Sequence, residues 1–357
     1  MSMLASCDPM FSVCIPVHNE RAWLGGAIES VLAQTWQSFE LIVSDNAPIE
    51  DLHSLVKEFD DPRIRYHRFD PLVGVVSSFN RACSLARGTW VHPLSADDRL
   101  HATCLERIAT VIDAEEGRRA DPIVLVAGSA RRVDSHGQRT EVGALDPRQR
   151  RPFPYGAIEG GVHEASGWLL ANTRTGGSSW MMGGLSFRRE TLVEAGAFRP
   201  EMEMCADLEL VLRLAAHGPV AYLDEPVVDY TVRPDSVSQL LIGEDLRRDT
   251  TTTMRNRAWL SGMEAHLTVR KVHSDECRGM RGAMARSLLQ RALSQRTNPA
   301  GRGVRAARKD VSRALRVHPK TVLSMKGLGV AVGASLLPTP ILHSLRTLGH
   351  RFGIVVV

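Results

Sequence analysis

Acidic and amide side chains stand at the ends of three apolar runs in this sequence, in a pattern that suits binding of a small polar ligand. The clusters are His18, Asn19 and Glu20, then Asp45 and Asn46, then Asp97 and Asp98. Carboxylate and amide oxygens accept hydrogen bonds, and carboxylates are the ligands that hard divalent cations prefer. The three clusters are therefore the first candidates for a binding or catalytic site.

The sequence has no glycine-rich loop that could bind phosphate through backbone N–H groups. Neither GxGxxG nor GxxxxGK(S/T) follows any of the apolar runs, which argues against a dinucleotide-dependent dehydrogenase and a P-loop nucleotide hydrolase. Carboxylates repel phosphate unless a divalent cation lies between them. The acidic clusters therefore point to a nucleoside diphosphate that a metal ion bridges to the protein.

Short apolar runs rich in β-forming residues alternate with segments whose apolar residues recur at helical spacing. The predicted strands are 11–17, 39–45, 64–69, 89–95 and 123–128, and the predicted helices are 20–34, 49–59, 74–87 and 102–116. Strands that alternate with single helices form a mostly parallel sheet with helices on both faces, and ligands gather at the carboxyl ends of its strands. The predicted fold class is therefore α/β, with the three clusters at one edge of the sheet.

The regular alternation ends near residue 134. Residues 135–178 are rich in glycine, proline and arginine and look like an insertion. A strand at 183–187, a helix at 207–217 and a strand pair at 220–232 are expected after it. Beyond residue 240 the pattern is helical and basic.

The 357 residues have the composition of an ordinary globular protein, with 43% hydrophobic and 24% charged residues. This composition excludes a disordered chain and a low-complexity one. The six cysteines form no CxxC pair, so we expect reduced thiols rather than a disulfide scaffold or a cysteine zinc site. No basic segment followed by an apolar one opens the sequence, so we expect no export and a cytoplasmic location.

The net charge of +4 is unevenly distributed along the chain. Residues 1–240 carry 23 basic and 33 acidic residues, a net −10, whereas residues 241–357 carry 21 basic and 7 acidic residues, a net +14. Such a basic segment favours an anionic partner, either lipid headgroups or nucleic acid. It lacks aromatic interleaving and any nucleic-acid-binding motif, so we expect no nucleic-acid partner.

Five segments within residues 11–238 together resemble the inverting nucleotide-sugar glycosyltransferases of family 2. In order they are FSVCIPVHNE, FELIVSDNAPIED, GVVSSFNRACSLARGTWVHPLSADD, LSFRRETLVEAGAFRPEMEMCADLELVLRLAAHG and VVDYTVRPDSVS. The resemblance implies the GT-A fold, a Rossmann-like, mostly parallel sheet. It also implies transfer of a sugar from a nucleotide-diphosphate donor, a UDP-sugar first, to a hydroxyl of a lipid-linked or polysaccharide acceptor, as in bacterial cell-envelope polysaccharide or glycolipid biosynthesis.

The resemblance also implies roles for single residues. Asp207 matches the general base, and Asp97 and Asp98 match the acidic motif that holds Mg²⁺ or Mn²⁺ on the diphosphate. The residues that match donor contacts are Pro16, Asn19, Glu20, Asp45, Asn80, Arg81, Asp97 and Arg233, of which Asp45 matches the acid that accepts hydrogen bonds from the base. Trp180, in a glycine-rich stretch, is a further candidate for stacking against the acceptor.

Two residues depart from the family's pattern. Ser95 stands where the acidic motif usually has its first Asp, and Arg233 stands where the last segment usually has His. A hydroxyl is a poorer partner than a carboxylate for a hard cation, whereas a guanidinium suits phosphate well. We hypothesise that the two changes are linked and lessen the dependence on the metal.

Each of these assignments has a structural alternative. Asp97 and Asp98 suit the cap of the helix that begins near residue 102, and Asp45 suits a turn. Asp207 suits the N-terminus of its own helix through the helix dipole, which is compatible with catalysis. Trp180 equally suits the hydrophobic core.

The basic C-terminal third has alternatives too. Residues 302–320 place Val304, Ala307, Val311 and Leu315 on one helical face among arginines, which suits peripheral contact with an anionic membrane such as the inner face of the plasma membrane. Residues 327–345 carry no formal charge, but their glycines and prolines favour an interfacial or packed helix over a spanning one. The whole third could instead pack on the catalytic domain or form a homo-oligomer contact.

These observations predict three regions. Residues 1–240 form the GT-A catalytic domain, with a nucleotide-sugar half at about 11–134 and an acceptor half at about 135–240. A basic helical region follows at 241–320, and an apolar or amphipathic tail at 321–357. An alternative function is a nucleotide-sugar-binding protein of the same fold with weakened catalysis, which Ser95 and Arg233 would explain. The sugar, the nucleotide and the acceptor stay open.

Overall fold

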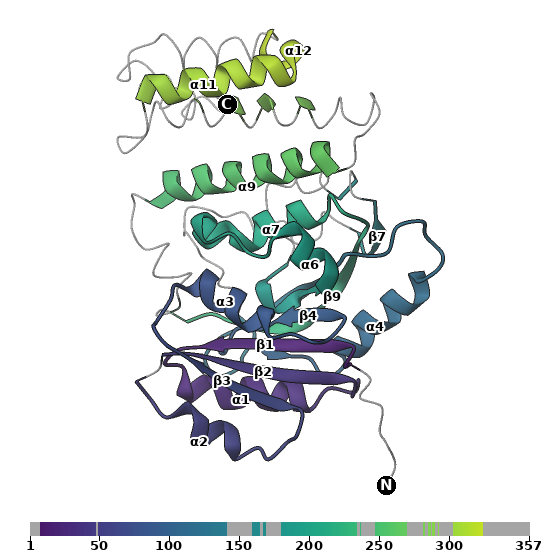
Figure 1. The fold of residues 1–357 in the computed structure, drawn as a ribbon, viewed down its shortest axis with the longest axis vertical. Helices are drawn as coiled ribbons and strands as arrows, with labels where there is room; N and C mark the ends of the chain where they lie inside the picture. The colour runs from purple at the N-terminus through teal and green to yellow at the C-terminus, as the bar shows by residue number, and fades with distance from the viewer. Residues whose placement is uncertain are drawn as a thin grey trace.

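The computed structural model describes residues 8–47, 49–140, 159–164, 167–168, 180–233, 236, 247–269 and 303–323, with isolated helical positions between 281 and 292. These residues form a nine-stranded sheet with helices on both faces (Figure 1). The predicted α/β fold is confirmed.

The strands are β1 (Phe11–Val17), β2 (Phe39–Asn46), β3 (Ile64–Phe69), β4 (Trp90–Pro93), β5 (Arg99–Leu100), β6 (Leu125–Val133), β7 (Gly161–His163), β8 (Leu185–Arg188) and β9 (Val220–Thr231). Their order is β3-β2-β1-β4-β8-β6-β9-β5, with β7 beside β9. The first four strands pair in parallel, whereas β8 runs antiparallel between β4 and β6. The carboxyl ends of β1, β2 and β4 therefore meet at one edge.

The helices are α1 (Arg21–Leu32), α2 (Leu52–Lys57), α3 (Val75–Ser84), α4 (Cys104–Glu115), α6 (Arg189–Ala195), α7 (Ala206–Leu214), α9 (Arg247–Val269), α11 (Gly303–Val317) and α12 (Pro319–Leu323), with short 3₁₀ turns η1 (Met182–Gly184) and η2 (Pro200–Cys205). Alternate side chains of a strand point to opposite faces of a sheet. Accordingly, Val13 and Ile15 pack in one core with α1, α2 and α4, and Cys14 packs in the other with α3, α7 and α9.

The strand pair predicted at 220–232 is wrong, because β9 is one strand of twelve residues. The register between β9 and β6 shifts around Ser129, which stands opposite Pro226. Asp224 and Glu225 are exposed at this shift. The sequence Asp-Glu-Pro looks like a turn, but a β-bulge accommodates extra residues at the surface without ending the strand.

Helix α9 packs directly on α7, across the boundary predicted at residue 240. A Cβ on Gly262 would lie only 2.5 Å from the Cβ of Leu212, so the two helices approach closely at this glycine. Trp259 and Met263 of α9 lie in the same core cluster as Leu212. In the structure the core of the catalytic half therefore continues into the basic region.

Within the described ranges, no helix is both long and apolar enough to cross a membrane. The uncharged stretch 327–345 and most of the predicted tail 321–357 lie outside those ranges.

Candidate active site

The loops that follow β1 and β2 are tied together by the first predicted cluster. His18 Nδ1 lies 2.8 Å from the carbonyl oxygen of Asn46, and the Asn19 amide nitrogen lies 3.0 Å from His18 Nε2. The His18 ring thus connects the end of β2 to the Asn19 side chain. Glu20 accepts from the backbone N–H of His18 at 2.9 Å, and Pro16 is half-buried at the end of β1.

Asp45, at the end of β2, is a buried carboxylate with one oxygen that lacks a hydrogen-bond partner among the described atoms. Its side chain is inaccessible to solvent, and one carboxylate oxygen accepts a hydrogen bond from the Tyr66 hydroxyl. The other oxygen, Oδ1, has no hydrogen-bond partner among the described atoms. Burial raises the pKa of Asp45 above its usual range. An unpaired buried acceptor is costly unless a ligand donates to it, so this oxygen suits the N–H of a nucleobase.

Asn46 and Arg81 fix the loop between β3 and α3. The Asn46 amide donates to the carbonyl of Val73 at 2.9 Å and accepts from the Val73 N–H at 3.1 Å. Arg81 donates to the carbonyl of Pro71 at 3.1 Å, and its guanidinium lies over the Phe69 ring. The sequence marks Asn46 only by its side-chain type and gives no sign of its hydrogen bond to Val73, 27 residues away.

The Asn80 side chain bonds to the backbone of a distant segment. Its amide donates to the Phe198 carbonyl at 2.8 Å and accepts from the Phe198 N–H at 3.0 Å. Both ends of the side chain are therefore occupied by backbone of the segment that leads into η2 and α7. Asn80 ties α3 to that segment, and its predicted donor contact stays a prediction.

The acidic pair after β4 is held by β9 and the residues that follow it. Asp98 is 1% exposed and accepts from the Thr231 N–H at 2.9 Å. The Thr231 hydroxyl also donates to the backbone carbonyl of Asp97. Burial raises the pKa of both carboxyls, and for Asp98 the neighbouring charge of Asp97 raises the pKa further. The pair is therefore built into the fold rather than placed as a helix cap.

Arg233 binds Asp97 directly. One of the two residues that depart from the family pattern is therefore in contact with the acidic motif. Nε and a terminal nitrogen of Arg233 each lie 2.8 Å from the same Asp97 oxygen. The guanidinium also lies 5.2 Å from the centre of the Trp23 ring. The charge of Asp97 is thus balanced by a cation from its own chain.

The acidic pair suits a divalent cation only together with a ligand that brings oxygens of its own. The described residues include no group of three or more His, Cys, Asp or Glu side chains that could hold a metal. Mg²⁺ is commonly held by one or two carboxylates together with substrate phosphates. The residues present fit such a shared site, to which the acidic pair would contribute carboxylate oxygens.

Asp207 is the second residue of α7, with its carboxylate at the N-terminal end of the helix. One oxygen accepts from the Leu208 N–H at 2.7 Å, and burial raises the pKa of the carboxyl above its usual value. A carboxylate with a raised pKa is a stronger base. This is the property that its predicted role requires.

A buried ion network around Glu209 anchors α7. Glu209 is fully buried, accepts hydrogen bonds from Arg213 at 2.9 and 2.8 Å and from the Ser261 hydroxyl of α9, and forms an ion pair with Arg199 at 3.0 Å. Arg213 also donates to the carbonyls of Ala195 and Ala197. The four-residue spacing of Glu209 and Arg213 could have indicated their pairing, but nothing in the sequence points to Ser261.

Trp180 is fully buried and stacks on Trp168, with ring centroids 5.4 Å apart. Trp168 in turn lies against Tyr222 of β9. A sugar-stacking platform needs an exposed ring face. The placement of Trp180 is that of a core residue, the alternative considered above, and we leave it out of the acceptor site.

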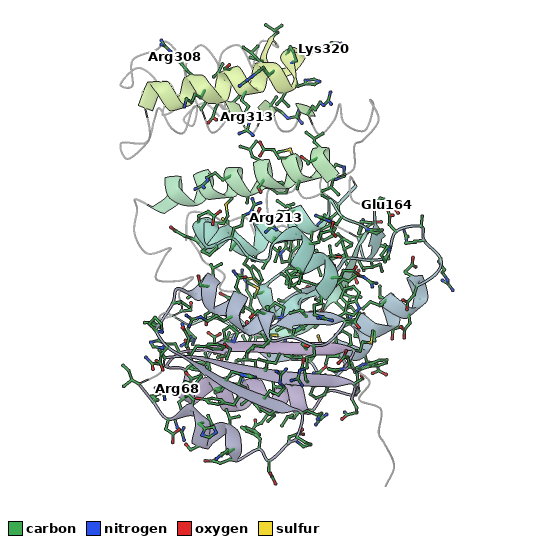
Figure 2. All side chains as sticks on the ribbon, in the orientation of Figure 1. Arg68, Glu164, Arg213, Arg308, Arg313 and Lys320 are labelled. Atoms are coloured by element: carbon green, nitrogen blue, oxygen red, sulfur yellow. The ribbon has the colours of Figure 1, made fainter. Side chains whose placement is uncertain are left out.

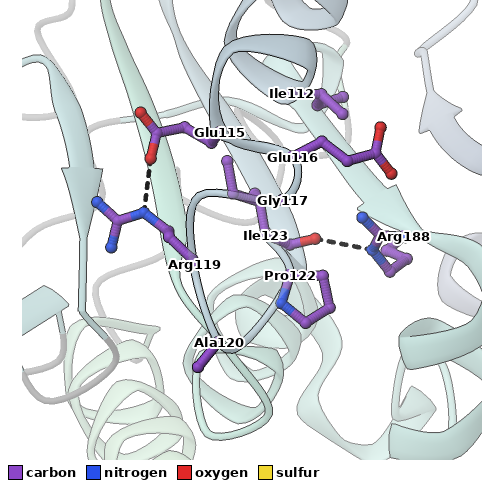
Figure 3. A pocket seen from close by; sticks show the side chains of 9 residues that line it. All are labelled: Ile112, Glu115, Glu116, Gly117, Arg119, Ala120, Pro122, Ile123 and Arg188. Carbon is purple, nitrogen blue, oxygen red and sulfur yellow. Dashed lines mark hydrogen bonds and ion pairs between the residues drawn. The ribbon is translucent and has the colours of Figure 1, made fainter.

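A small cavity of about 210 Å³ lies elsewhere, beneath the C-terminal end of α4 (Figure 3). Glu116, Arg119 and Arg188 border it. Arg188 pairs with Trp90, the first residue of β4, whereas the acidic pair follows the last residue of that strand. The cavity is therefore at the opposite end of β4 from the candidate site and contains none of its residues.

The comparison with known protein families agrees with this site. Residues 12–168 match the family described as glycosyl transferase family 2. They form a glycosyltransferase family 2 domain. The match covers the three clusters on β1, β2 and β4, and the predicted family is confirmed.

Individual relatives resemble parts of this chain. An uncharacterized protein of Mycobacterium tuberculosis is 26% identical over 60% of this chain and 65% of its own length. A PGL/p-HBAD biosynthesis glycosyltransferase of Mycobacterium bovis is 37% identical over 30% of this chain and 43% of its own length. The chain thus matches about half the length of these relatives.

A solved structure shares the fold over almost the whole chain. S. aureus TarS 1-349 in complex with UDP-GlcNAc has a TM-score of 0.65 at 14% identity, over 96% of this chain and 92% of that one. At this identity the likeness shows a common fold, which agrees with the GT-A architecture predicted from the motifs.

Proposed function

We propose that the protein is an inverting glycosyltransferase that moves a sugar from a nucleoside-diphosphate donor to a hydroxyl group of a glycan or lipid-linked acceptor. The observation that carries the proposal is the carboxyl edge of the sheet. There Asp45, at the end of β2, has a buried carboxylate oxygen without a partner among the described atoms, and Asp97 after β4 forms an ion pair with Arg233 after β9. These groups suit a nucleobase and a diphosphate respectively, and the family 2 match supports the same activity. The UDP-GlcNAc bound by TarS makes UDP-sugars the first donors to test.

Asp207 is the proposed general base. Its carboxylate takes the proton of the acceptor hydroxyl while the new bond from that oxygen to the sugar carbon forms. In the same step the bond between the sugar and the diphosphate breaks, and the nucleoside diphosphate leaves with the electron pair. One displacement with one base inverts the configuration at the sugar. General bases of this kind contribute about 10²–10⁴-fold to the rate.

Mg²⁺ or Mn²⁺ would be held by Asp97 together with the donor's diphosphate, and would stabilise the negative charge of the leaving group. In the free protein Arg233 occupies Asp97, so the guanidinium competes with a cation for the same carboxylate. A diphosphate offers Arg233 a bidentate partner of higher charge. We propose that Arg233 passes from Asp97 to the diphosphate when the donor binds, and that Asp97 then becomes available to the metal.

A nucleotide-sugar-binding protein without catalysis is the second candidate. The observation that favours it is the pairing of Asp97 with Arg233, next to the missing carboxylate at Ser95. It would bind donors at the same edge but would neither transfer nor hydrolyse them. Measured turnover therefore decides between the two.

A thermal-shift screen of nucleotide sugars with and without Mn²⁺ tests the donor site, because a ligand that binds only the native state raises the melting temperature. We expect stabilisation by UDP-sugars and, on the stabilising donor, slow hydrolysis that yields the free nucleoside diphosphate. Stabilisation without any hydrolysis or transfer would favour the binding protein. No stabilisation by any nucleotide sugar would contradict both. The cytoplasmic location and contacts between copies of the chain stay predictions.

A further inference from the structure

The apolar face of helix α11 packs in the interior of the protein. Ala307, Val311 and Ala314 are buried in the same core cluster as Met263 of α9. The face predicted from the sequence included Leu315, which is instead 38% exposed. At 3.6 residues per turn, positions 307, 311 and 314 share a stripe that excludes 315. The apolar face of this helix is therefore not available for insertion into a membrane.

The opposite face of α11, continued by α12, is exposed and basic. Its exposed cations are Arg308, Lys309, Arg316 and Lys320. The only acidic residue of the segment 303–323 is Asp310, which is 6% exposed. Figure 2 shows Arg308 and Lys320 on the side away from α9 and Arg313 on the side toward it, where it pairs with Glu264. We call the four exposed cations the basic face.

Two leucines accompany the basic face. Leu315 of α11 and Leu323 at the end of α12 are both exposed, Leu323 by 66%. Exposed leucines next to cations fit a lipid surface, where the charges meet headgroups and the leucines enter the interface. A nucleic acid would instead favour aromatic side chains for base stacking, and residues 303–323 contain none.

We propose that the basic face is an electrostatic docking surface for a membrane that contains anionic lipids. The charge of the rest of the chain favours docking through this face, since residues 1–240 carry a net charge of −10 and an anionic surface repels them. The inference does not depend on glycosyl transfer, because it rests on the charge and exposure of α11 and α12 alone.

Vesicle flotation of the full chain tests the proposal. We expect binding to vesicles of phosphatidylcholine with phosphatidylglycerol, none to phosphatidylcholine alone, and release in high salt because exposed charges are screened. Each basic side chain near an anionic surface contributes about fivefold to the partition coefficient. The quadruple variant Arg308→Gln, Lys309→Gln, Arg316→Gln and Lys320→Gln should therefore lose on the order of several hundredfold.

A matched control removes four exposed cations from the sheet domain, Lys57, Arg87, Arg118 and Arg189, each to Gln. This variant has the same net charge as the first but should retain vesicle binding. Circular dichroism of both variants checks that they fold. Equal loss in the two variants, or undiminished binding by the basic-face variant, would overturn the proposal. Binding to a DNA duplex without binding to anionic vesicles would also overturn it.

Discussion

Replacing Arg233 with Gln should change metal binding and nucleotide binding in opposite directions. The substitution removes the cation that neutralises Asp97 and leaves a shorter, uncharged polar side chain. Without the guanidinium, the Asp97 carboxylate is open to Mn²⁺ before any donor arrives. Without the guanidinium, the diphosphate also loses one of its partners.

The size of both effects follows from the geometry of the pair. Two nitrogens lie 2.8 Å from one carboxylate oxygen, and the side chains of Arg233 and Asp97 are only 12% and 15% exposed. Hydrogen bonds to charged groups contribute about 1.5–3 kcal/mol net. Affinity for Mn²⁺ in the absence of nucleotide should therefore rise about 10- to 100-fold, and affinity for UDP in the absence of metal should fall by a similar factor.

Isothermal titration calorimetry of the free protein with Mn²⁺ and with UDP measures both constants. Arg63→Gln is the matched control, because Arg63 also pairs with an aspartate, Asp61, at 2.6 Å, but just before the first residue of β3, at the opposite end of that strand from the functional edge. Neither constant should change in the control. If Mn²⁺ binds Arg233→Gln no more tightly than the parent protein, Arg233 does not compete with the metal and the exchange proposed above is refuted.

Three further predictions concern the base site, the buried network and acid stability. Asp45→Asn should weaken UDP binding about tenfold by calorimetry, because the charge-assisted hydrogen bond to the base becomes a neutral one; unchanged affinity would place the base elsewhere. Glu209→Gln should lower the free energy of unfolding, measured in urea, by about 3 kcal/mol, because it leaves buried arginine charge uncompensated. The control Glu194→Gln, at an exposed position, should stay within about 0.5 kcal/mol of the parent protein. Equal losses in the two variants would show that the network does not stabilise the fold. Burial lowers the pKa of His92 to about 4, so as the pH falls this histidine takes up a proton in the unfolded chain before it does in the folded protein. The free energy of unfolding should therefore fall by about 3 kcal/mol between pH 6.5 and 4. His92→Gln should reduce this dependence on pH, and an unchanged dependence would show that His92 does not cause it.

The sheet and its functional edge could be predicted because they depend on local patterns. The run 11–17 alternates residues between the two cores, and its end coincides with the start of the first polar cluster. The same alternation predicts that Asp45 and the acidic pair lie at strand ends, and the parallel pairing of β1 with both β2 and β4 brings those ends to one edge. The order of the strands could not be predicted in this way, since alternation does not determine which strands are neighbours.

Contacts between distant segments could not be predicted. Asn80 looks like a ligand-binding amide in the sequence, but its partner is the backbone of Phe198, 118 residues away. The close approach of Gly262 to Leu212 likewise joins a helix of the basic region to the catalytic half. The net charge changes sign near residue 240, which separates the catalytic half from the basic region in the sequence. Composition does not show which faces of helices are buried, so it cannot show that the two regions share a core. The boundary in charge and the boundary in packing therefore differ.

The replacement of Asp207 with Asn tests the proposed reaction most directly, because it keeps the shape of the side chain and removes its basicity. Transfer from the preferred UDP-sugar to an acceptor is measured beside UDP affinity in the same preparation. Nearly complete loss of transfer with undiminished UDP affinity is the predicted result. Transfer at more than about a tenth of the parent rate would contradict the assignment of Asp207 as the general base.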